Sequence, residues 1–220
     1  MKLNRTRMTA ILLAAIACAS LALSGCSPRL IGKAKAKEAG LAFINKVFDV
    51  NEIKATVEYE ERAGFTYVNG CSVHYGTEEP IRVYVIKVNP DEIGNFDYYA
   101  EVNAVTGEAY RADKAWELLK SMTAEQQTRA DELYSQEIEW SKVLQSVAQQ
   151  ETTPEAEKWF KDVFHPDAPI LSTIFFLSEG DSFLRNGIDV EDYIVLLDGT
   201  MYSLDMVWPT FEVLSITRVS

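Results

Sequence analysis

Histidine, cysteine and basic residues are scarce in this chain of 220 residues, and each shortage excludes a class of function. Two histidines and three cysteines offer little material for a zinc site or for a disulfide scaffold. Lysine and arginine together number 21 against 33 acidic residues, so the formal net charge is −12. Nucleic acids and anionic lipids are bound largely through positive charge. We therefore expect no nucleic-acid partner.

The familiar catalytic motifs are also missing. The sequence contains no phosphate-binding loop, no dinucleotide fingerprint, no HExxH and no GxSxG. A serine triad has few possible partners because there are only two histidines. The pattern predicts a protein that is not an enzyme, with no catalytic residues, no metal and no cofactor. What the chain does have is 47% hydrophobic residues, enough for a packed core.

The first 25 residues have the organisation of a signal peptide. Lys2, Arg5 and Arg7 form a positively charged start, and an uncharged apolar stretch from Ala10 to Leu23 follows. That stretch suits the hydrophobic region of a signal peptide and is short for a transmembrane helix. An uncleaved anchor or an ordinary signal peptide remains the alternative.

The apolar stretch ends in Leu23-Ser24-Gly25-Cys26, which resembles the lipobox of bacterial lipoproteins. The resemblance implies that a diacylglycerol is attached to the sulfur of Cys26 and that cleavage makes Cys26 the new N-terminus. It implies a lipid-anchored protein of the cell membrane or outer membrane, outside the cytoplasm. Removing residues 1–25 takes away three positive charges and no negative one, so the net charge falls from −12 to −15. We read residues 26–37 as a tether.

The next part of the chain predicts one helix followed by antiparallel strands. Apolar residues recur at helical spacing over residues 34–48. Strand patterns follow at residues 55–61, 65–68, 81–88 and 98–104, and Thr106-Gly107 turns the chain into a short return strand. In the 98–104 segment, alternation predicts that Tyr99, Glu101 and Asn103 lie on the solvent face.

This order of elements, ending in residues 99–110, resembles the PepSY domain. The Thr106-Gly107-Glu108 turn matches the family's C-terminal signature, and Asn103 stands where the family has an aspartate. The resemblance covers about Lys35 to Asp113. PepSY domains occur in propeptides of secreted proteases and in cell-envelope proteins, and they are taken to bind or inhibit peptidases. The resemblance implies no catalytic residues, because the family has none.

The second half repeats helix and then strands. Thr123 and Gln126 form a capping box that opens a helix ending near residues 149–152, and Thr153-Pro154 predicts the start of another. Strand patterns follow at 170–177, 193–197, 201–204 and 211–219, with Asp198-Gly199 as a hairpin turn. We predict an α+β fold of two tandem helix-plus-meander units, 38–113 and 114–220, joined by a helical segment, in preference to one continuous sheet.

Sites for metal or acid–base chemistry are poorly specified. Cys71 and His74 are three residues apart, so on a strand they point to opposite faces and cannot share a metal. Acidic residues gather at Glu58, Glu60 and Glu61, at Glu78 and Glu79, and between Asp181 and Asp192. The last segment lacks EF-hand spacing, so calcium binding stays open and a solvated acidic surface is favoured.

Binding is the remaining function. Aromatic residues at Tyr98 and Tyr99, or an open sheet edge at 211–219, offer places where a peptide could be added as a strand. The sequence therefore predicts a non-enzymatic, lipid-anchored envelope protein that binds a protein or peptide and could modulate a peptidase. A small-ligand or stress-sensing envelope lipoprotein is the alternative.

Overall fold

The computed structural model describes residues 28–62, 66–68, 71–73, 80–134, 140–177 and 187–219. The chain divides into two units, Met1–Leu30 and Ile31–Ser220. Everything below concerns the second unit. The lipobox, the hydrophobic stretch, His74, Glu78, Glu79 and residues 181–186 of the acidic segment lie outside the described residues. No helix in the described ranges is long and apolar enough to cross a membrane.

The elements of the first half follow the predicted order. Helix α2 (Lys33–Phe48) is followed by β1 (Thr56–Arg62), the short pair β2 (Thr66–Val68) and β3 (Cys71–Val73), then β4 (Ile81–Val88), β5 (Tyr98–Asn103) and β6 (Ala109–Lys114). The turn before β6 forms as expected, because Gly107 has a φ of +82° and its amide donates to the Asn103 carbonyl. A 3₁₀ turn, η1 (Trp116–Leu118), leads out of this half.

The second half has helices α3 (Ala124–Tyr134) and α4 (Trp140–Phe164), then β7 (Ile170–Leu177), β8 (Ile188–Leu196), β9 (Met201–Trp208) and β10 (Glu212–Arg218). The capping box forms as predicted: the Gln126 amide donates to Thr123 Oγ1, and Gln126 Oε1 accepts from the Thr123 amide. The Asp198-Gly199 turn also forms, with Gly199 at a φ of +89°.

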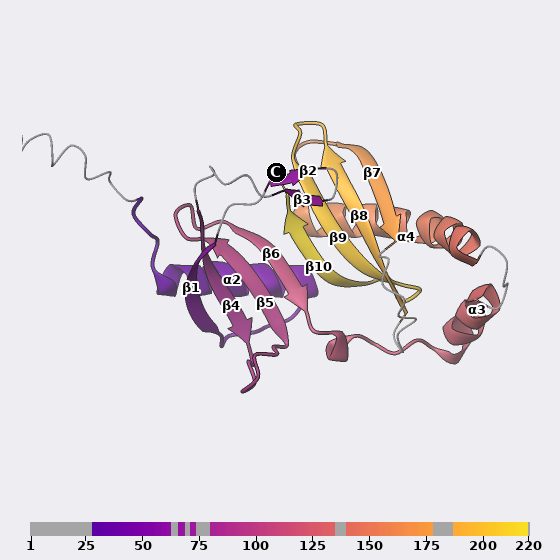
Figure 1. Cartoon of the computed structure of the whole chain (residues 1–220), viewed down its shortest axis with the longest axis horizontal. Helices are drawn as coiled ribbons and strands as arrows, with labels where there is room; N and C mark the ends of the chain where they lie inside the picture. Colours follow the sequence, from indigo (N-terminus) through magenta and orange to yellow (C-terminus); the bar gives the residue numbers. More distant parts are fainter. Residues whose placement is uncertain are drawn as a thin grey trace, which may run out of the picture. The chain divides into compact units, whose positions relative to one another are not determined.

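Eight strands make one antiparallel sheet in the order β1-β4-β5-β6-β10-β9-β8-β7 (Figure 1). The fold is therefore α+β, as predicted. The prediction against one continuous sheet was wrong, because β10 pairs with β6 and joins all eight strands. The outer strands of the sheet are β1 and β7.

Helices α2 and α4 cover one face of the sheet (Figure 1). Ile44 of α2 packs in one cluster with Ile86 of β4 and Ala100 of β5, and all three are fully buried. Under α4, Phe160 packs with Ile194 and Leu204. Gly40 lets α2 approach β4 closely, since a Cβ there would lie 2.7 Å from Ile86 Cγ1. The apolar clusters under α2 and α4 are therefore on the helix side, and the opposite face carries polar side chains, although Asp192 of β8 lies on the helix side.

The predicted break at Thr153-Pro154 was wrong, because α4 runs through it as one helix. Ala148, Thr152, Ala156 and Phe160 are spaced by four residues and are all fully buried, so one continuous stripe faces the sheet. Pro154 is exposed, and its ring lies away from that stripe. Burial of the stripe outweighs the hydrogen bond that proline removes.

Candidate functional site

The face of the sheet opposite the helices carries a band of polar side chains, which we call the polar face. The register places Tyr99, Asp113, Ser215, Asp205 and Glu191 in one row across five neighbouring strands. A second row beside it contains Glu101, Arg111, Thr217 and Ser203. Successive residues of a strand point to opposite faces of the sheet, so every second residue of a strand lies on the polar face. Where these residues are polar on neighbouring strands, the register places them in a row.

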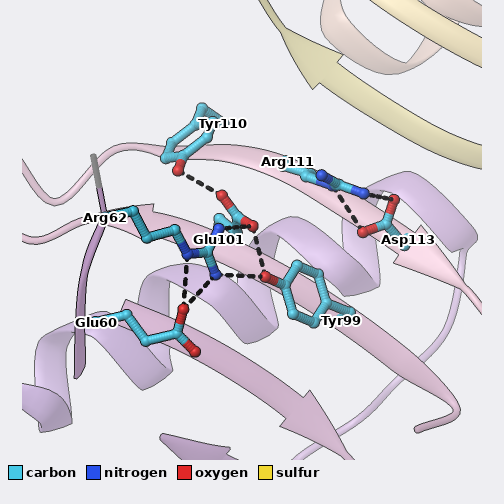
Figure 2. A network of polar contacts seen from close by, with 7 residues as sticks. All are labelled: Glu60, Arg62, Tyr99, Glu101, Tyr110, Arg111 and Asp113. Carbon is cyan, nitrogen blue, oxygen red and sulfur yellow. Dashed lines mark hydrogen bonds and ion pairs between the residues drawn. The ribbon is translucent and has the colours of Figure 1, made fainter. Parts of the chain in front are cut away.

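Glu101 is the centre of a hydrogen-bonded network at the β1 end of the polar face (Figure 2). Its Oε1 accepts from Tyr99 Oη at 2.5 Å and from Arg62 Nη1 at 2.8 Å, and its Oε2 accepts from Tyr110 Oη at 2.5 Å. Arg62 also donates to Glu60 Oε2. The side chain of Glu101 is only 5% exposed. The prediction of a solvent-facing Glu101 was therefore wrong.

The network fixes the charge state of its members. Burial raises the pKa of Glu101, but the bonds from Tyr110, Tyr99 and Arg62 outweigh this, and the net pKa lies below its usual value. Burial and the neighbouring carboxylate raise the pKa values of Tyr99 and Tyr110. Glu101 is thus a weak base and the two tyrosines are weak acids. This arrangement suits a structural clamp better than proton transfer.

A second ion pair lies beside the network. Arg111 Nε donates to Asp113 Oδ2 at 2.8 Å, and the guanidinium lies 5.8 Å from the centre of the Tyr99 ring (Figure 2). Burial raises the pKa of Asp113, and Arg111 opposes part of that rise. The β1 end of the polar face thus provides cations for its buried carboxylates.

Among the described residues, no such cation belongs to the principal interactions of Asp189 on β8 or Asp205 on β9. Burial, with Asp189, Glu191 and Asp113 nearby, raises the pKa of Asp205 to about 7, although Ser215 donates to it. Burial and the charge of Glu191 raise the pKa of Asp189 to about 6. Asp205 lies on β9, and Asp189 lies on β8, which begins at Ile188 rather than at residue 193 as predicted. No group of three or more metal-ligating side chains is placed to hold an ion within the described ranges.

Strand β7 is an outer strand of the sheet, and no other described strand pairs with its outer side. None of its eight residues, Ile-Leu-Ser-Thr-Ile-Phe-Phe-Leu, is charged. Ile174 is 48% exposed, Phe176 49% and Leu171 62%. The Phe176 ring contacts Tyr193 on β8, at 5.4 Å between ring centres. An exposed apolar edge strand with free backbone groups is a surface to which another strand can be added.

The predicted binding residues Tyr98 and Tyr99 are placed on opposite faces. Tyr98 packs against Phe48 of α2 at 5.3 Å between ring centres, and Tyr99 belongs to the Glu101 network. Their strand, β5, is paired with β4 and β6. The predicted open edge at 211–219 was wrong, because β10 pairs with both β6 and β9. The role of the two tyrosines in binding stays a prediction.

Two features of the site could not be predicted from the sequence. Glu101 gave no signal, because its partner Arg62 lies 39 residues away and only the sheet register brings them together. Asp192, fully buried under α4 with Thr153 Oγ1 donating to its Oδ1 at 3.0 Å, was expected in a loop. The β7 edge could have been found, since the run 170–177 lacks any charged residue.

Comparison of the chain with protein-family models, with curated proteins and with solved structures finds no match. The lipoprotein and PepSY-like readings therefore stay predictions.

Proposed function

We propose that this protein binds an extended segment of another protein or peptide by strand addition to β7, while a lipid on Cys26 holds it at the cell envelope. The observation that carries the binding part is the exposed, uncharged edge strand β7. An added strand would bond to the backbone groups on the free side of β7. Its alternate side chains would lie beside Ile174 and Phe176.

The polar face supports a binding role rather than a catalytic one. General acid–base catalysis needs a group whose pKa lies near the working pH and that can reach a substrate. Glu101 is buried, and three donors hold it in its ionised form. Asp205 and Asp189 have raised pKa values, but the hydroxyl that contacts Asp205 belongs to the buried Ser215, and no cofactor-binding motif accompanies these acids among the described residues. We therefore assign the protein no reaction.

The binding proposal can be tested with a double variant of β7. Full-length wild-type chain, Ile174→Lys/Phe176→Lys, and a control Ile53→Lys/Ile93→Lys are used as bait on detergent-solubilised envelope membranes. The control changes residues that are 73% and 85% exposed outside β7, so it adds the same charge elsewhere. We expect proteins that bind wild type and control to be lost from the β7 variant. Identical protein sets on all three baits, or no bound protein on any, would contradict strand addition.

The lipid anchor has support from the sequence only: three basic residues, an apolar stretch and Leu23-Ser24-Gly25-Cys26 in the expected order. Metabolic labelling with a palmitate analogue tests it. Cys26→Ala should abolish labelling and move the protein out of the membrane fraction, whereas Cys18→Ala should leave both unchanged. Retention of the Cys26→Ala variant in membranes would mean that the apolar stretch is an ordinary anchor.

We also propose that the sheet consists of two tandem α+β units, 38–113 with the PepSY-like pattern and 114–220. The strand order supports this division. Each half has a helix followed by four sheet strands, and the last strands, β6 and β10, meet in the middle of the sheet. The units would then share one sheet while each keeps its own helix. A peptidase is a suitable partner for such a protein, by resemblance to PepSY domains.

A further inference from the structure

A cavity lies at the beginning of β7, where the chain leaves α4. Its volume is about 370 Å³, and it is open to solvent on one side. Its walls combine an apolar floor with two nitrogen-bearing side chains: Lys161, His165, Pro166, Ala168, Pro169 and Ile170. Lys161 and His165 are both exposed, so their nitrogen atoms are accessible to a ligand.

The direction of an added strand determines which of its ends reaches this cavity. All the pairings of the eight-stranded sheet are antiparallel. A strand that continues this pattern on the free side of β7 runs opposite to β7. Its C-terminal end therefore lies beside Ile170, at the cavity, and its earlier residues lie beside Ile174 and Phe176.

We propose that the segment bound at β7 is the C-terminus of its protein, with its free carboxylate held by Lys161 and His165 and its last side chain against Pro166, Ala168 and Pro169. The inference depends on the proposed strand addition and names the chemistry of the partner. An apolar C-terminal residue suits these walls. A free carboxylate suits the two nitrogen donors.

The charges around the cavity make Lys161 the decisive residue. The ammonium of Lys161 lies 3.3 Å from Glu157 Oε2, and an ammonium has three donors, so two remain for a ligand. Helix α4 ends at Phe164, and the carbonyl end of a helix carries a partial negative charge that repels an anion. Without the positive charge of Lys161, a peptide carboxylate would meet this negative end with little compensation.

Display libraries of random octapeptides test the inference. In one library the peptides end in a free carboxylate, and in the other the C-terminus is joined to the carrier and the N-terminus is free. Both are selected against the full-length chain in detergent. Enriched sequences are then synthesised as the free acid and as the C-terminal amide, and their affinities are measured by fluorescence anisotropy.

We expect enrichment from the free-carboxylate library, and about fivefold weaker binding by the amides, the size of effect expected for one exposed ionic contact. Lys161→Glu should remove the difference between acid and amide. Lys158→Glu, the same change at an exposed position of α4 outside the cavity, should preserve it.

The outcomes separate the two proposals. If acid and amide bind equally but Ile174→Lys/Phe176→Lys abolishes binding, the C-terminal inference is wrong and strand addition stands. If no peptide is enriched from either library, or if the β7 variant binds as well as wild type, strand addition is wrong and the C-terminal inference with it.

Discussion

The two outer strands of the sheet differ sharply in charge. Strand β1 contains Glu58, Glu60, Glu61 and Arg62 among its seven residues, whereas β7 has no charged residue among its eight. Charged side chains on an edge strand discourage pairing with another chain. One edge of this sheet is therefore protected in the usual way, and the other lacks the protection that soluble proteins normally keep.

The two halves also differ in how the charges of their buried carboxyl groups are compensated. In the half formed by β1, β4, β5 and β6, the buried carboxylate of Glu101 is neutralised by Arg62 and two tyrosines. In the half formed by β7 to β10, the part of the chain that the structure describes provides no comparable cation for Asp189 and Asp205, and burial raises their pKa values. The buried charge of the first half is therefore compensated. The described part of the second half retains buried acids without a compensating cation, which reduce stability, and such features are expected near binding surfaces.

The largest effect of a single substitution on stability should come from the network in the first half. Glu101→Gln removes the charge that Arg62 and the two tyrosines share, so we expect a loss of about 3 kcal/mol in the free energy of unfolding at pH 7. Urea denaturation measures it. Glu58→Gln, the same change at a side chain that is 59% exposed, is the control and should cost little. Equal effects of both substitutions would show that the network adds no stability.

The second half should make stability depend on pH. The pKa values of Asp189, Asp192 and Asp205 are about 6, 6 and 7, above the ordinary value of 3.8. Between these values the folded state binds more protons than the unfolded state, so stability rises as the pH falls. Between pH 8 and pH 5 we expect a gain of about 1 kcal/mol from each acid with a pKa of about 6 and about 2.5 kcal/mol from Asp205, measured by urea denaturation.

Two observations check the assignment of this pH dependence. Asp205→Asn should flatten the curve between pH 8 and pH 5, because it removes the group with the highest of the three pKa values. Further acidification should reverse the trend, since the pKa of Glu101 is lowered and its protonation breaks the network. A stability that increases with pH across the 5–8 range would contradict the raised pKa values of these acids.

The two glycine turns test whether the halves unfold separately. Gly107 has a φ of +82°, while a Cβ there would lie no closer than 3.5 Å to Ile31. Gly107→Val should therefore destabilise the chain by about 1.5 kcal/mol through backbone strain alone. Hydrogen exchange should locate the loss in β5 and β6 and spare the Gly199 hairpin. Uniform loss in both halves would indicate one cooperative sheet and would contradict the tandem-unit proposal.

Local patterns in the sequence were sufficient to place most strands and turns. The bounds of β4, the capping box at Thr123 and the turns at Gly107 and Gly199 depend on residues close together in the chain, and they were predicted correctly. Long-range packing was not accessible in this way. Helix α4 continues through Pro154 because its buried stripe faces the sheet, and no local signal at Thr153-Pro154 reveals that stripe's partner.

For the candidate site, too, local features could be predicted from the sequence and long-range contacts could not. The absence of charge in β7 is visible in the sequence, but its position at the sheet edge depends on the β6–β10 pairing, which joins residues about a hundred positions apart. The sequence indicated 211–219 as the open edge instead. Likewise, Glu101 and Arg62 are neighbours only through the register of β1 with β4 and of β4 with β5.

The smallest effect on the free energy of unfolding should come from adding a charge to β7. This substitution compares the two outer strands of the sheet directly. Leu171 is 62% exposed, so Leu171→Lys should change the free energy of unfolding by less than about 0.5 kcal/mol. Tyr59 on β1 is 38% exposed, and its ring lies 5.5 Å from that of Tyr84, so Tyr59→Lys should cost about 1 kcal/mol. Urea denaturation compares the two. If Leu171→Lys proves the more costly, the apolar side chains of β7 serve the protein's own core, and the argument that they await a partner fails.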